Sequence, residues 1–251
     1  MTFATPSAAA DWIIETATAF MQSPDNDLQM PDGPEPAFGQ PLLGFASGAD
    51  PLWDTFKEHV GSFHWTPAEA FALGYPEEVV DATELSIVSW ILPQTEATRR
   101  DNRKEKDFPA HRWVRARIFG ELVNENLRAH LVEKIRELGV QVVAPSLLPE
   151  WSRTSSKLSS NWSERHAAYV AGLGTFGLCD GLITRVGKAM RTGALVVRAN
   201  LPVTLVNTRI IGNTACNLIP VRARHASSGV RLELWGPKAM ISLPARLIWT
   251  T

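Results

Sequence analysis

The chain has 251 residues, 45% of them hydrophobic, and a formal net charge of −1. This length and apolar content suffice for one large domain with a full core. A charge so close to zero gives no general electrostatic footprint for nucleic acid or membranes, and two cysteines cannot build a disulfide framework. No apolar run approaches the roughly 20 residues of a membrane span.

The N-terminal part predicts a helix followed by a long irregular segment. Residues 1–24 hold two acids, Asp11 and Glu15, and no basic residue, so they lack the basic region of a secretory signal and a twin-arginine leader. We therefore expect a cytoplasmic protein. Residues 7–21 combine helix formers with an apolar face, whereas residues 23–51 are rich in Pro, Gly and Asp and predict an extended loop.

The middle of the chain alternates helix and strand signals. Thr66-Pro67-Ala68-Glu69 predicts a helix start with a capping box, and Leu85 to Leu92 predicts a buried strand ended by Pro93. Residues 111–138 predict a long helix ended by Gly139, before strands over 140–144 and 194–201. The apolar positions of this helix, at helical spacing, are Val114, Ile118, Leu122, Leu127, Leu131 and Ile135. This order favours an α/β (α+β) domain, a mixed sheet packed by helices.

Three glycines at G-x-G-x-x-G spacing, Gly172, Gly174 and Gly177, lie in the most informative stretch. A dinucleotide site needs a strand before this motif and a helix after it. Here residues 163–171 predict a helix and residues 178–184 a turn into a strand, so that reading fails. A phosphate P-loop fails on spacing as well. The simplest alternative is a helix stopped by a glycine, with two more glycines in the turn.

The residues around the glycines resemble a particular family. Asn161 to Ala168, Ala171 to Gly177, Asp180 to Thr184 and Gly187 to Gly193 are similar to the signature of the corrinoid-dependent iron–sulfur reductases, the epoxyqueuosine reductases and reductive dehalogenases. Upstream, residues 89–95 and 98–103 add to the resemblance, which covers roughly residues 60–204.

The resemblance implies a nitroreductase-like, corrinoid-binding domain over residues 1–204, holding cobalamin base-off beside two 4Fe-4S clusters. Backbone amides in a glycine loop can form an anion nest, and a guanidinium is a fork of donors for a phosphate. We expect the corrinoid to meet this set of residues: Ser163, Arg165, Gly172, Leu173, Gly174, Thr175, Phe176 and Gly177. The alternative for Arg165 is an exposed helix charge.

The iron–sulfur half of the family pattern is missing. Cys179 and Cys216 are the only cysteines, too few for one cluster. Residues 205–251 also differ in composition, because they hold one acid, Glu233, against six Lys and Arg, whereas 25 of the 26 acids precede them. The alternatives for this irregular tail are a reading-frame slip and a genuine divergent sequence.

A frameshift near Thr204-Leu205 would explain the tail. Shifting the frame back by one nucleotide can turn four tail residues into cysteines and the next residue, Arg231, into proline. The result is C-x7-C-x2-C-x3-C-P, an arrangement typical of bacterial ferredoxins. The four residues are Ala215, Ala223, Ala226 and Val230. The tail then replaces a 4Fe-4S ferredoxin domain, and the chain as written is expected to be inactive.

Three functions stay open. The first is the front half of a cobalamin-dependent, 4Fe-4S-linked oxidoreductase, acting on a small-molecule or modified-nucleoside substrate with ferredoxin or flavodoxin as electron donor. The second is a non-catalytic corrinoid-binding module, and the third is a flavin-binding nitroreductase-like enzyme. No proton donor is assigned, although Tyr169 lies on the signature helix and Lys157 lies in the segment before it.

Two further features have weaker readings. Residues 99–107 form a charged run that predicts a solvated loop, with docking of a tRNA substrate as the functional alternative. His59 and His64 are conceivable metal ligands, but no cysteine or acid cluster accompanies them, so we expect no metal site from protein side chains.

Overall fold

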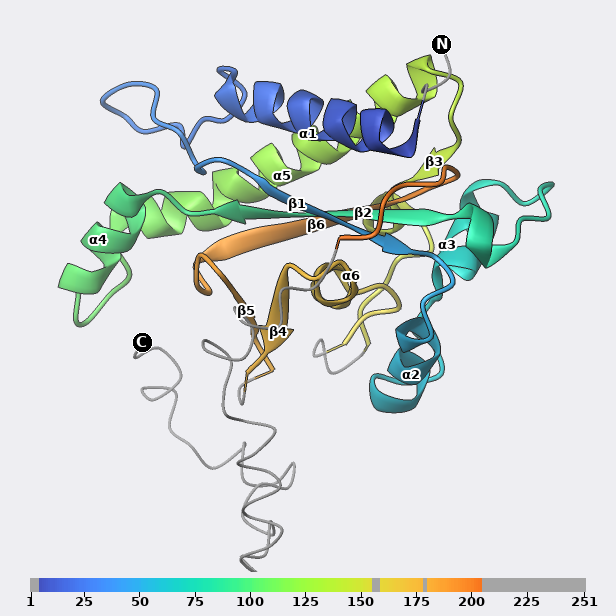
Figure 1. Cartoon of the computed structure of the whole chain (residues 1–251). Helices are drawn as coiled ribbons and strands as arrows, with labels where there is room; N and C mark the ends of the chain where they lie inside the picture. Colours follow the sequence, from blue (N-terminus) through green and yellow to red (C-terminus); the bar gives the residue numbers. More distant parts are fainter. Residues whose placement is uncertain (1–4, 155–158, 178–179, 205–251) are drawn as a thin grey trace, which may run out of the picture.

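The structure, a computed structural model, describes residues 5–154, 159–177 and 180–204 (Figure 1). Its centre is a four-stranded sheet with the order β1-β2-β6-β3. Helices α1 and α5 cover one face of the sheet, whereas α6 lies against the other (Figure 1). The expected α+β class is therefore confirmed, and each strand pair in the described part is antiparallel.

The strands of the main sheet are β1 (Leu42–Ser47), β2 (Ser86–Pro93), β3 (Val142–Val143) and β6 (Met190–Val197). A separate hairpin pairs β4 (Gly174–Phe176) with β5 (Leu182–Thr184). The helices are α1 (Pro6–Gln22), α2 (Leu52–His59), α3 (Pro67–Gly74), α4 (Glu96–Lys104), α5 (His111–Glu137) and α6 (Glu164–Val170).

The sheet separates two large apolar cores, and Ile91 of β2 belongs to a third, smaller cluster with Ala168 and Leu182. Val88, Trp90 and Leu92 pack with α1 and α5, whereas Ile87 packs on the opposite face with α2, α3 and α6. Successive side chains of a strand point to opposite faces, so a strand covered on both faces is buried on both, and even the polar Ser86 and Ser89 of β2 lie inside. This explains why β2 is an uninterrupted buried run, as its sequence predicts.

Several predicted elements are confirmed at their ends. The Thr66 capping box is complete, since Thr66 Oγ1 accepts the Glu69 N–H at 3.3 Å and Glu69 Oε2 accepts the Thr66 N–H at 2.8 Å. Gly139, after α5, has a φ of +76°, a backbone conformation that glycine adopts without strain.

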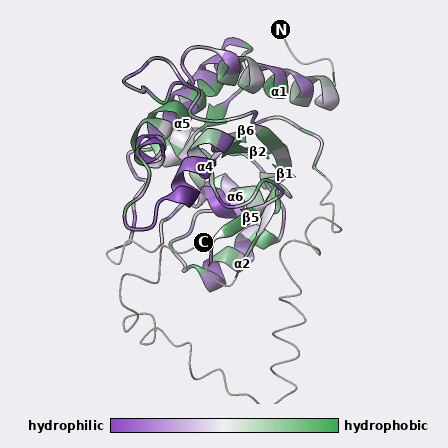
Figure 2. Ribbon diagram, turned by 90° about the vertical axis from the view of Figure 1, so that its left-hand side faces the viewer, coloured by the Kyte–Doolittle hydropathy of each residue, from purple (hydrophilic) through white to green (hydrophobic). Residues whose placement is uncertain are grey.

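Two predictions of loops are wrong. The segment 23–51 contains β1, because an apolar stretch after Pro41 pairs with β2 despite the surrounding Pro and Gly residues. The charged run at 99–107 begins inside α4, a helix that Figure 2 colours as mainly hydrophilic. Thr95 Oγ1 caps α4, and Glu96 forms ion pairs with Arg99 at 2.9 Å and Arg103 at 2.6 Å, so local charge pairing holds a helix that has little apolar content.

The long helix has the expected bounds, but its first half turns a different face to the core. Val114, Ile118 and Leu122 are exposed, whereas the C-terminal members of the same spacing are buried. In the first half of α5, small residues face the core in their place. A Cβ on Gly120, for example, would lie 2.8 Å from the Phe38 ring. Among the described residues, no helix is both long and apolar enough to cross a membrane.

A close contact between Trp90 and Gly193 fixes the centre of the sheet. The two residues pair across β2 and β6, and a Cβ on Gly193 would lie 2.1 Å from the indole ring. The Trp90 Nε1–H donates to Asn124 Oδ1 at 2.9 Å, and Asn124 Nδ2 donates to the Thr192 carbonyl at 2.9 Å. These contacts together fix the position of the Trp90 indole.

We expect Gly193→Ala to lower the free energy of unfolding by about 1–3 kcal/mol, because the methyl group overpacks a buried ring. Urea denaturation measures this change. Gly39→Ala is the matched control, since its Cβ would meet nothing closer than 3.6 Å. Equal stability of the two variants would show that the strands separate easily at Trp90.

Candidate functional site

Helix α6 and the turn after it carry the glycine motif. The Gly172 N–H donates to the Tyr169 carbonyl at 3.1 Å and the Leu173 N–H to the Ala168 carbonyl at 2.9 Å, while Gly172 has a φ of +71°. These two bonds and the left-handed glycine form a Schellman motif. The first glycine thus ends the helix, as the simplest sequence interpretation holds.

The other two glycines allow the β4–β5 hairpin to close tightly. A Cβ on Gly174 would lie 2.6 Å from the Ile183 carbonyl oxygen, and one on Gly177 would lie 2.7 Å from Ile183 Cδ1. The Gly177 N–H donates to the Gly181 carbonyl at 3.0 Å. With Gly172 and Leu173, this makes three motif amides that donate within the chain, so these three are not the bare donors that the sequence suggested.

The side chains of the motif are more accessible than its amides. Arg165 is exposed, and its Nη1 donates to the Asp180 carbonyl at 2.9 Å. Thr175 and Phe176 are half-buried on β4. The structure therefore brings Arg165, the hairpin and the Schellman turn together. Ser163 instead turns its Oγ to His166 Nδ1 at 2.7 Å.

A buried ion pair anchors the start of α6. Arg128 of α5 is 2% exposed, and its Nη2 lies 2.7 Å from Glu164 Oε1. Ser146 donates to the same oxygen at 2.9 Å. Burial raises the pKa of Glu164, and the Arg128 charge and the Ser146 hydroxyl oppose this rise. Sequence analysis missed the pair, because residues 36 positions apart meet only through the fold.

A cluster of aromatic and histidine side chains lies beneath α6. The His166 ring centroid is 4.5 Å from that of Phe56, 4.7 Å from Phe176 and 5.6 Å from His64. Tyr169 is also in this cluster, with its ring 5.5 Å from that of Phe176. The cluster joins the signature helix to α2 and to the loop after it, a contact that no sequence spacing indicates.

His64 is the unusual member of this cluster. It has zero exposed area, and neither ring nitrogen has a hydrogen-bond partner among the described residues. Burial, followed by the Lys57 charge, lowers the pKa of His64 to about 4. Burial, followed by His64 and Arg165, lowers the pKa of His166 to about 3. Both imidazoles are therefore neutral at pH 7.

The described residues do not assemble a metal centre. No group of three or more His, Cys, Asp or Glu side chains in this part of the chain is arranged to hold a metal ion. The two histidines singled out by the sequence differ in environment, since His59 is exposed with its Nδ1 2.8 Å from the Thr55 carbonyl oxygen. Cys179, Cys216 and Lys157 lie outside the described residues.

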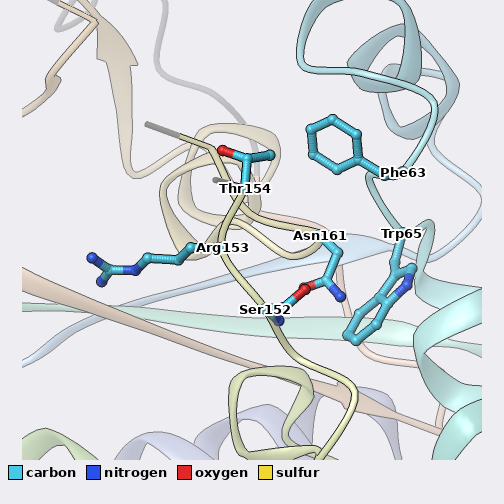
Figure 3. Close-up of a pocket in the computed structure, with 6 residues that line it drawn as sticks. All are labelled: Phe63, Trp65, Ser152, Arg153, Thr154 and Asn161. Carbon is cyan, nitrogen blue, oxygen red and sulfur yellow. The ribbon is translucent and has the colours of Figure 1, made fainter. Parts of the chain in front are cut away.

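A cleft opens beside the cluster, between the loop before α3 and the segment before α6 (Figure 3). Its volume is about 360 Å³. Two aromatic side chains face a polar segment across it (Figure 3). The lining residues are Phe63, Trp65, Ser152, Arg153, Thr154 and Asn161.

No protein-family model and no curated protein matches the chain. One similar solved structure is selenomethionine-labelled epoxyqueuosine reductase, with 14% identity and a TM-score of 0.36, over 78% of this chain and 48% of that one. Another is epoxyqueuosine reductase with an epoxyqueuosine-modified tRNA-Tyr stem loop, with 13% identity and a TM-score of 0.35, over 78% and 47%. The chain thus spans about half the length of these proteins.

The two buried histidines make stability depend on acid. The unfolded chain protonates them near pH 6.5, whereas the folded chain keeps His64 neutral to about pH 4. The two histidines therefore cost no stability above about pH 6.5. As the pH is lowered toward 4, the free energy of unfolding falls by about 1.4 kcal/mol per pH unit for each group.

We expect His64→Phe to make the free energy of unfolding, measured by urea denaturation between pH 7 and 4, fall less steeply than in the wild type. His59→Phe, at an exposed position, is the control and should keep the wild-type slope. If wild type and His64→Phe lose stability in parallel, His64 is not a buried neutral imidazole.

Proposed function

We propose that the chain is the corrinoid-binding front part of a cobalamin-dependent, 4Fe-4S-linked reductase of the epoxyqueuosine reductase or reductive dehalogenase kind. The observation that carries the proposal is the signature block around α6. Its helix, its Schellman turn and the β4–β5 hairpin form one continuous unit with Arg165 exposed on it. The sequence resemblance and this local arrangement support the same region.

The side chains of this unit fit a corrinoid better than its amides do. Arg165 uses one donor on Asp180, so the rest of its fork remains for a phosphate. Thr175 and Phe176 offer a hydroxyl and a ring from the half-buried strand β4. Of the proposed binding set, Gly172, Leu173 and Gly177 would shape the backbone, since their N–H groups are already used. A bound cobamide would supply the strongly reducing metal centre.

The chain does not fit iron–sulfur clusters. A cluster of this kind takes four thiolates, and the whole chain has two cysteines. We therefore propose no electron-transfer step and expect no turnover from the chain as written. Ferredoxin or flavodoxin as donor, a small-molecule or modified-nucleoside substrate, tRNA docking at α4 and a cytoplasmic location remain parts of the proposal for the longer protein.

Cobalamin titration of the purified chain tests the proposal. We expect a base-off absorption spectrum on binding, and at least tenfold weaker binding by Arg165→Ala, because a fork of charge-assisted donors is lost. Arg100→Ala removes another exposed guanidinium, on α4, and should bind like the wild type.

Three other results would contradict parts of the proposal. Binding of flavin in place of cobalamin would favour a nitroreductase-like enzyme. Cobalamin binding that Arg165→Ala leaves unchanged would move the site away from α6. Cobalamin binding with turnover, given a chemical electron donor, would refute the expected inactivity.

The suspected frameshift at 204–205 gives a second test, on the DNA. The tail 205–251 lies outside the described residues, so the proposal rests on its composition. We expect sequencing from codon 195 past the stop to show a lost or gained base near codon 204. Restoring the frame should then yield a brown protein with the visible absorption of cysteine-ligated iron–sulfur clusters. Codons that cannot be re-read as cysteine at Ala215, Ala223, Ala226 and Val230 would refute the idea.

A further inference from the structure

The cleft between Phe63 and Trp65 on one side and residues 152–154 and Asn161 on the other has fixed walls. The Trp65 N–H donates to the Asn161 carbonyl at 2.7 Å, which ties one wall to the other. The Asn161 side chain also holds its own segment, since Oδ1 accepts the Ser152 N–H at 2.9 Å and Nδ2 donates to the Glu150 carbonyl at 2.7 Å. The opening thus exists before any ligand enters, which lowers the cost of binding.

One wall of the cleft is aromatic and accessible. Phe63 is 42% exposed, and Trp65 is half-buried beside it. Figure 3 shows both rings on the same side, facing the segment that carries Thr154 and Asn161. Large aromatic side chains that keep an open face are suited to stack a planar ring, as they do with bases in nucleic-acid complexes.

The opposite wall supplies a hydroxyl and a cation. Ser152 and Arg153 are both exposed. The Arg153 guanidinium lies 5.7 Å from the centre of the Trp151 ring, and within the described ranges no carboxylate forms an ion pair with it. In Figure 3 its side chain extends away from the two rings. A ligand anion bound by Arg153 would therefore lie away from the two rings.

We propose that this cleft binds a nucleotide, a planar heteroaromatic ring that carries a phosphate. The ring would stack on Trp65 and Phe63, while the phosphate would take the fork of donors on Arg153. The volume of about 360 Å³ is within the range of small-molecule sites. Among the described lining residues there is no carboxylate to favour a metal ion, and their cation and hydroxyls do not suit a purely apolar ligand.

The nucleotide can be free or can be the tail of a larger cofactor, because both present the same ring and phosphate. The inference does not depend on the corrinoid proposal, since it concerns residues outside α6 and the β4–β5 hairpin. Its test uses a free nucleotide, so that it succeeds or fails independently of cobalamin titration.

Isothermal titration of the full chain with AMP and with adenosine tests the inference. We expect AMP to bind in the micromolar to low millimolar range, roughly as single-module contacts do. Trp65→Leu should weaken both ligands at least tenfold. Arg153→Gln should weaken AMP about fivefold or more and leave adenosine unchanged, whereas Arg117→Gln, at an exposed position of α5, should change neither. Phe63→Leu, at the more exposed ring, replaces Trp65→Leu if that variant does not fold.

Absence of AMP binding, or binding that Trp65→Leu, Phe63→Leu and Arg153→Gln leave intact, would overturn the inference. Competition distinguishes the two sources once binding is seen. Displacement of AMP by cobalamin but not by cobinamide, which lacks the nucleotide tail, would assign the cleft to the cofactor tail. No displacement by either would assign it to a free nucleotide.

Discussion

The ion pair between Arg128 and Glu164 is the constraint on which the candidate site depends. It joins α5, on one face of the sheet, to the start of α6 on the other. In the described part of the chain β3 pairs only with the end of β6, at Val196 and Val197, so that the rest of this edge does not separate the two residues. Removing one partner of such a buried pair leaves an uncompensated charge, which costs more than the pair contributes. The pair therefore fixes where α6 begins.

The histidine cluster, the β4–β5 hairpin and the cleft are all placed relative to the start of α6. With its first residue held by Arg128, α6 brings His166 against Phe56 and His64, and its last turn delivers the chain into the β4–β5 hairpin. The cleft adjoins the same region, because Asn161 lies just ahead of the ion pair in sequence and binds Trp65. A corrinoid at Arg165 and a nucleotide at Trp65 would thus share one rigid support.

The sequence predicts the elements whose signals are local and fails where distant residues decide. The Thr66 capping box, the apolar run of β2 and the glycine end of α6 were predictable, since each rests on neighbours in the chain. The strand β1 was not, because Leu42–Ser47 becomes a strand by pairing with β2. The candidate site divides in the same way: its motif was visible in the sequence, but the histidine cluster and the cleft join segments about 100 residues apart.

The two large apolar cores lie on opposite faces of the sheet, and only one of them adjoins the candidate site. The core under α1 and α5 contains Trp90 and Leu127 but none of the residues proposed to bind a ligand. The candidate site instead adjoins the other core, where the two ring nitrogens of His64 have no partner among the residues that the structure describes and loops form the walls of the cleft. A fold built in this way can change its ligand on one side without repacking the other. The sheet separates the two faces, so that substitutions that alter ligand specificity affect the packing on only one of them.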